Sequence, residues 1–82
     1  MKKYTVYELL GDHEELRIKV AEDLTLEGVY SLYHSLATSA YRINNSFIAT
    51  ILEFNCTMTI KSLGILIKSY VAVPQGANNK DK

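Results

Sequence analysis

Hydrophobic and polar residues alternate along three stretches of the chain, and a period of two predicts β-strands that bury one face. These stretches are residues 16–20 (LRIKV), 56–60 (CTMTI) and 65–73 (ILIKSYVAV). Residues 3–10 (KYTVYELL) are rich in aromatic and β-branched side chains, which also favour a strand. Because the polar connection 11–15 (GDHEE) begins with a glycine suited to a turn, we predict an antiparallel hairpin of 3–10 and 16–20.

A different period follows the hairpin, since apolar residues recur every three or four positions from 26 to 41, which predicts an amphipathic helix. Thr25 is a suitable N-cap, and Glu27 in the first turn suits the helix dipole. The predicted apolar face consists of Leu26, Val29, Tyr30, Tyr33, Leu36, Ala37, Ala40 and Tyr41. The predicted polar face consists of Glu27, Ser31, His34, Ser35, Thr38 and Arg42. We expect the helix to stop at INNS, with Asn44 or Asn45 in a left-handed conformation.

Residues 46–54 (SFIATILEF) fit neither period well, and their β-branched and aromatic content favours a strand over a short helix. The predicted fold is therefore α+β: a small antiparallel sheet in β-β-α-β-β-β order with one amphipathic helix packed on one face. We expect residues 1–74 to form a single domain, because Pro74 stops the last strand, and 75–82 to form a disordered polar tail. Residues 65–73 are predicted to be an edge strand that pairs with its copy in a dimer.

Charge is unevenly distributed along a chain whose formal net charge is zero. Seven of the nine acidic residues lie between positions 8 and 27, whereas residues 28–79 contain only Arg42, Glu53, Lys61 and Lys68 as formal charges. Two interpretations remain open for this sparsely charged part. Its surface consists of uncharged polar side chains, or another chain covers part of it, because interface cores are depleted in charge and enriched in tyrosine. The second interpretation predicts a homodimer.

Catalytic and metal-binding patterns are missing from the sequence. There is no GxSxG, Walker or GxGxxG motif, and the acidic turn around His13 has none of the spacings of zinc or calcium sites. Cys56 is the only cysteine, which excludes an internal disulfide and fits a reducing compartment. We interpret Cys56 as a buried structural thiol on the face of Met58 and Ile60, since a nucleophile would need a base such as His34 beside it. We predict no enzyme activity, no metal and no cofactor.

The remaining classes are membrane and nucleic-acid proteins. The N-terminus lacks the apolar run of a signal peptide, and the most apolar segment, 64–73, is short and contains Lys68. We therefore expect a soluble, cytoplasmic protein without a membrane span. Nucleic-acid binding is disfavoured by the missing basic patch. It is the alternative function, and its candidate residues are Arg42, Asn44, Asn45, Lys61 and Lys68.

A protein partner of unknown identity fits these observations best. Clustered acidic residues can occupy a basic groove on a partner, and tyrosines at the margin of a helix face are frequent interface anchors. The predicted partner-binding residues are Asp12, Glu14, Glu15, Glu22, Asp23, Tyr30, Tyr41 and Arg42. In its size, its hairpin-then-helix order and its helix start LTLEGVYSLY, the chain resembles small inhibitors carried by phages and other mobile elements. That resemblance implies an inhibitor that binds a host protein.

Overall fold

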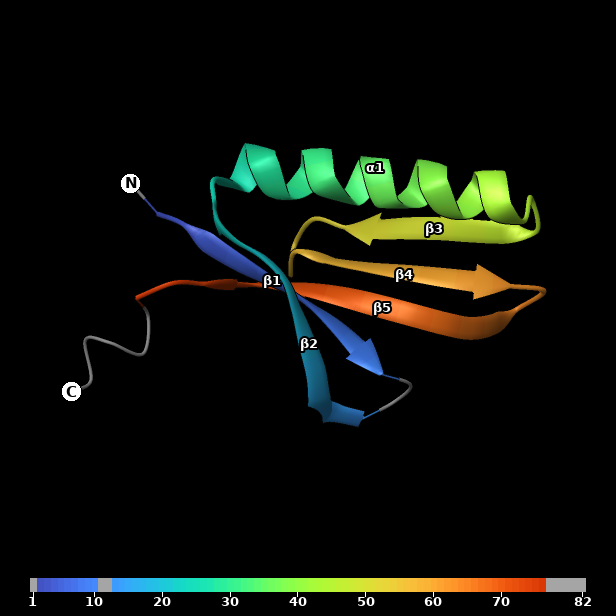
Figure 1. Cartoon of the computed structure of the whole chain (residues 1–82), viewed down its shortest axis with the longest axis horizontal. Helices are drawn as coiled ribbons and strands as arrows, with labels where there is room; N and C mark the ends of the chain where they lie inside the picture. The colour runs from blue at the N-terminus through green and yellow to red at the C-terminus, as the bar shows by residue number, and fades with distance from the viewer. Residues whose placement is uncertain (1, 11–12, 77–82) are drawn as a thin grey trace.

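A computed structural model describes residues 2–10 and 13–76 of the chain, apart from the side chains of residues 13–15. The elements are β1 (Tyr4–Leu10), β2 (His13–Leu24), α1 (Leu26–Ile43), β3 (Phe47–Leu52), β4 (Thr57–Ser62) and β5 (Ile65–Pro74). The strands form one antiparallel sheet, and α1 packs on one of its faces (Figure 1). The predicted α+β fold and the predicted order of elements are confirmed.

The order of strands across the sheet is β2-β1-β5-β4-β3, which places β5 in the centre. The prediction that residues 65–73 form an edge strand is therefore wrong. Its alternation was correctly interpreted, because Tyr70 and Ala72 are buried on one face. Alternation indicates which face of a strand is exposed to solvent, however, and it does not indicate which strands pair with it on either side. The two edges of the sheet are β2 and β3.

The core lies between α1 and the sheet. Val29 and Tyr33 of α1 are fully buried, and they form one cluster with Val6, Met58, Ile60, Tyr70 and Ala72 of the sheet. Tyr33 is the largest of the fully buried side chains. Its hydroxyl donates a hydrogen bond of 2.7 Å to the carbonyl oxygen of Cys56, so its polar end is satisfied inside the core.

Both ends of α1 follow from local hydrogen bonding. The Thr25 side chain accepts a hydrogen bond of 3.1 Å from the N–H of Gly28, as predicted for an N-cap. At the other end, α1 continues to Ile43, two residues past the prediction. Asn44 is extended (φ −153°) and holds Ser46 through its side-chain oxygen. Neither Asn44 nor Asn45 has a positive φ, so the expected left-handed cap is wrong.

Strand boundaries differ from the prediction in several places, three of which bear on the site. β2 begins at His13, so much of the expected 11–15 connection belongs to the strand. Residues 46–54 contain a strand, as favoured, and β3 ends at Leu52. Cys56 lies in the turn that follows, with φ 57°, rather than in a strand, although it does pack against the core. The Cys56 carbonyl accepts hydrogen bonds from the Tyr33 hydroxyl and the Ala72 N–H, which hold the turn against the core.

The segment expected as a polar tail, 75–82, falls mostly outside the described residues. Its first residue, Gln75, is held at the sheet. Its N–H donates to the carbonyl of Lys3 at 2.7 Å, and its side-chain oxygen accepts from the N–H of Asp23 at 2.7 Å. Gln75 therefore links the strand pair β1–β2 to the end of β5.

The turn between β4 and β5 yields a stability prediction. Leu63 and Gly64 both have positive φ (53° and 80°), which is the type I′ geometry that favours Asn-Gly. Leu63 is 86% exposed, so its side chain adds little packing. We expect Leu63→Asn to raise the free energy of unfolding by about 0.5–1 kcal/mol, because asparagine tolerates this conformation and leucine does not. Urea denaturation measures the change, and Leu63→Val, a β-branched control, should lower the stability instead.

Candidate functional site

The two edges of the sheet differ in how they are protected against another strand. Unpaired edge strands bind other chains unless charges, prolines or bulges prevent it. β2 contains seven ionisable residues in twelve, and its pairing with β1 is interrupted by three register irregularities. β3 (FIATIL) contains no charge, proline or glycine, and its pairing with β4 is regular throughout. Its other edge has no strand partner among the described residues.

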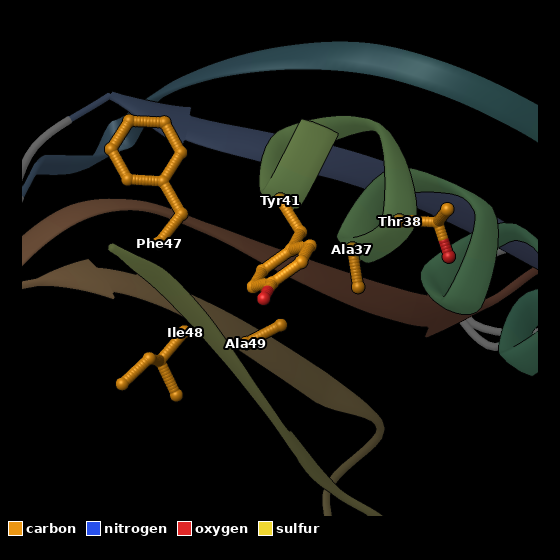
Figure 2. A pocket seen from close by; sticks show the side chains of 6 residues that line it. All are labelled: Ala37, Thr38, Tyr41, Phe47, Ile48 and Ala49. Atoms are coloured by element: carbon orange, nitrogen blue, oxygen red, sulfur yellow. The ribbon is translucent and has the colours of Figure 1, made fainter. Parts of the chain in front are cut away.

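A groove runs between this unprotected strand and the C-terminal half of α1. We call it the edge groove; its lining residues are Ala37, Thr38, Tyr41, Phe47, Ile48 and Ala49, and its volume is about 420 Å³. Figure 2 shows Tyr41 reaching from α1 toward β3, while Phe47 and Ile48 point to opposite sides of the strand. The lining is predominantly apolar. Apolar side chains of a bound segment would therefore fit there.

Exposed apolar side chains flank β3 at both of its ends. Ile43 is 81% exposed and Tyr41 is 59% exposed, and both lie in the last turn of α1 next to the start of β3. Phe54 is 84% exposed and lies just beyond the end of β3. On the strand itself, Ile48 is 66% exposed. Exposed apolar side chains close to a free strand edge are candidates for contact with another molecule.

Two charges accompany these apolar residues. Arg42 is exposed in the last turn of α1, and Glu53 is exposed directly after β3. Neither side chain forms an ion pair within the described part of the chain. The carbonyl oxygen of Glu53 accepts a hydrogen bond of 3.3 Å from the Tyr30 hydroxyl, which leaves the carboxylate in solvent.

The predicted partner-binding residues are not brought together. Glu22 and Asp23 lie at the end of β2, before α1, whereas Tyr41 and Arg42 lie in its last turn. An 18-residue helix separates the two groups, and such a helix is about 27 Å long. Of the other predicted acidic residues, Asp12 and the side chains of Glu14 and Glu15 lie outside the described residues.

Internal contacts also engage part of that predicted set. The carboxylate of Glu22 is 2.9 Å from the Lys19 ammonium. Tyr30 turns its hydroxyl toward the β3–β4 turn, where it lies 3.9 Å from the Cys56 sulfur, and partial burial raises the pKa of that hydroxyl. Tyr41 and Arg42 are the predicted residues that lie at the unprotected edge.

Of the candidate nucleic-acid residues, Arg42, Asn44 and Asn45 lie together at the end of α1, whereas the two lysines lie on the sheet. Lys68 is on the helix side of the sheet, 3.6 Å from the Glu8 carboxylate. Lys61 lies on a different side, since it follows the buried Ile60 in β4. Asn44 is engaged with Ser46. Arg42 therefore has no basic neighbour from this set beside it at the end of α1.

Two arrangements considered from the sequence, a metal centre and a Cys–His pair, were sought among the described residues. No three His, Cys, Asp or Glu side chains among them are placed to hold a metal ion. His34 is exposed on the outer side of α1, among Ser35, Thr38, Ser39 and Arg42. Cys56 lies beneath the other side of the helix, beside Tyr30. A Cys–His pair is therefore not formed.

Comparison with known proteins adds no family or relative. No protein-family model matches the chain, and neither a curated protein nor a solved structure gives a significant match.

Among the described residues, α1 does not combine the length and the apolar character that a membrane-spanning helix requires.

Sequence reasoning missed the contribution of β3, represented by Phe47, Ile48 and Ala49. One signal was available, because residues 46–52 contain no charge, proline or glycine. A strand of that composition is suited to a protected interior position or to an edge that another chain covers. Choosing between these requires the strand order, which the sequence alone does not contain.

Proposed function

We propose that the protein is a non-catalytic module that acts by binding another polypeptide. The bound segment adds an extended strand to the free edge of β3, and its apolar side chains enter the edge groove. One observation carries this proposal: β3 is a regular, uncharged edge strand without any of the protective features that β2 has.

In this mode of recognition, the backbone and the side chains of the binding protein have different roles. Main-chain hydrogen bonds to an edge strand supply affinity with little sequence preference, and pockets for alternate side chains supply specificity. β3 offers the unpaired backbone, and the edge groove beside it offers an apolar pocket. Tyr41 forms one wall of that pocket, and tyrosine at an interface combines a large apolar surface with a polar end.

Roles for Tyr41 and Arg42 in partner binding remain part of the proposal, because Tyr41 lines the edge groove and Arg42 follows it in the last turn of α1. The acidic residues Glu22 and Asp23 belong to the other edge strand, β2. An inhibitor role, in which these acids steer the protein to a basic groove of a host protein, is a separate hypothesis. It does not depend on β3.

Peptide selection tests strand addition directly. We would select binders from a displayed library of random eight-residue peptides and measure their affinities by calorimetry. Ile48→Lys places a charge on the edge strand itself, on the sheet face away from α1 (Figure 2), and it should weaken the selected peptides at least about tenfold. Because Ile48 is 66% exposed, the fold should tolerate this change.

Ile65→Lys is the matched control, since Ile65 is 67% exposed and lies on β5, outside the groove. It should leave peptide affinity nearly unchanged. NMR should show chemical-shift changes in Phe47–Leu52 and in the last two turns of α1. Equal binding to both variants, or shift changes centred on β2, would contradict the proposal.

A further inference from the structure

We propose that the polypeptide bound at this edge is β3 of a second copy of the chain. The two sheets then join into one continuous sheet across a two-fold axis. This inference rests on the proposed function, because it requires strand addition at β3, and it names the occupant. In the arrangement we infer, the two β3 strands are antiparallel and Thr50 faces its own copy.

The composition of β3 suits pairing with itself. In a register centred on Thr50, Ile48 faces Leu52 of the second copy, and Ala49 faces Ile51 of the second copy. Ile48 and Leu52 are 66% and 38% exposed and lie on the sheet face away from the core, so each would cover the other. β-Branched and aliphatic cross-strand pairs stabilise antiparallel sheets, and like charges opposite each other destabilise them. No charge of β3 faces its own copy, because β3 has none.

Antiparallel pairing also brings the exposed apolar ends of the two strands together. The start of β3, flanked by Tyr41 of the edge groove, would lie beside the end of the second β3, which carries Phe54. Symmetry repeats this contact at the other end. The exposed large apolar side chains at both ends of β3 are thus covered in one step, which a short parallel segment would not achieve.

Charge complementarity supports the same orientation. The register centred on Thr50 places Glu53 of the second copy opposite Phe47, and Phe47 shares the edge groove with Tyr41, next to Arg42. Two symmetric Arg42–Glu53 pairs therefore form between the copies. These two side chains account for all formal charges between residues 28 and 60. An interface with an apolar centre and a few charges at its rim is typical of protein–protein contacts.

The two edge grooves meet in this arrangement. Residues that face each other across an antiparallel pair point to the same side of the sheet, so both helices lie on one face. The side chains of α1 that line the groove are Ala37, Thr38 and Tyr41, of which two are small. The small residues leave space at the joint, and each Tyr41 becomes covered by the other copy.

A cysteine at the two-fold axis provides a sharp test. Residues facing each other in an antiparallel pair have Cα atoms about 4.5–5.5 Å apart, within the range that a disulfide spans. We expect Thr50→Cys, combined with Cys56→Ser, to form a disulfide-linked dimer on mild oxidation. Thr59→Cys, also with Cys56→Ser, is the control. Thr59 is the partner of Thr50 on β4, one strand further from the axis, so it should stay unlinked.

Light scattering of the unlinked wild type over a concentration series measures the association itself. We expect a dimer for the wild type and for Ile65→Lys, and a monomer for Ile48→Lys. A wild type that is monomeric at all concentrations but binds selected peptides would overturn the second copy as occupant and leave the proposed function standing. A monomer that binds no peptide would overturn both. A dimer linked through Thr59→Cys, and not through Thr50→Cys, would overturn the β3 pairing.

Discussion

Replacing Tyr33 with alanine is expected to lower the free energy of unfolding by about 3–5 kcal/mol, as for other buried aromatic side chains. Tyr33 is fully buried, its ring centre lies 6.4 Å from that of Tyr70, and its hydroxyl binds the Cys56 carbonyl. Small domains have total stabilities of about 5–15 kcal/mol. A chain of 82 residues should therefore be close to unfolding at room temperature after this single change.

Urea denaturation followed by circular dichroism gives the measurement. The variant Tyr33→Phe separates the contribution of the buried ring from that of the hydroxyl's hydrogen bond. Phenylalanine keeps the ring in the core and removes the hydroxyl, while the Cys56 carbonyl still accepts a hydrogen bond from the Ala72 N–H. That change should cost about 0.5–1.5 kcal/mol, the net contribution of one hydrogen bond. If Tyr33→Ala were no more destabilising than Tyr33→Phe, the ring would not be a centre of the core.

The faces of α1 were predictable because a helical period assigns each residue a direction. Val29 and Tyr33, in the middle of the predicted apolar stripe, are fully buried, and Ser31 and His34 of the polar face are exposed. The margins of the stripe were less predictable. Tyr30 and Tyr41 occupy similar positions on the helical wheel, yet Tyr41 is exposed and Tyr30 turns toward the β3–β4 turn. Burial at a margin depends on what the next element covers, which the helix itself does not encode.

The position of the candidate site also depends on neighbouring elements, so it could not be derived from the sequence. Hydrophobic alternation predicted the strands but left their order open, so β5 was expected at the edge that β3 occupies. The scarcity of charge after position 28 was a valid signal of a covered surface. The sparsely charged part of the chain comprises α1, β3, β4 and β5. Among these strands, β3 is the one with a free edge in the described sheet, since β4 and β5 have neighbours on both sides.

Raising the pH from about 10 to 12 is expected to destabilise the protein by several kcal/mol, because two core tyrosines resist ionisation. Burial raises the pKa of Tyr70 to about 12, with the nearby Glu8 carboxylate adding to the effect. Burial also raises the pKa of Tyr33, still further. An unfolded tyrosine ionises near pH 10. Between these values the unfolded chain has lost the protons and the folded chain retains them, so rising pH favours unfolding.

Each buried tyrosine contributes a loss of up to about 1.4 kcal/mol per pH unit in this window, and the two together remove about 4 kcal/mol across two units. Below pH 10 their contribution to stability is constant. Urea midpoints measured at pH 9, 10, 11 and 12 test this expectation. Tyr70→Phe removes one of the two groups and should reduce the slope by about half. A wild type whose stability is flat from pH 10 to 12 would mean that these hydroxyls are solvated, which would contradict the packing of α1 against the sheet.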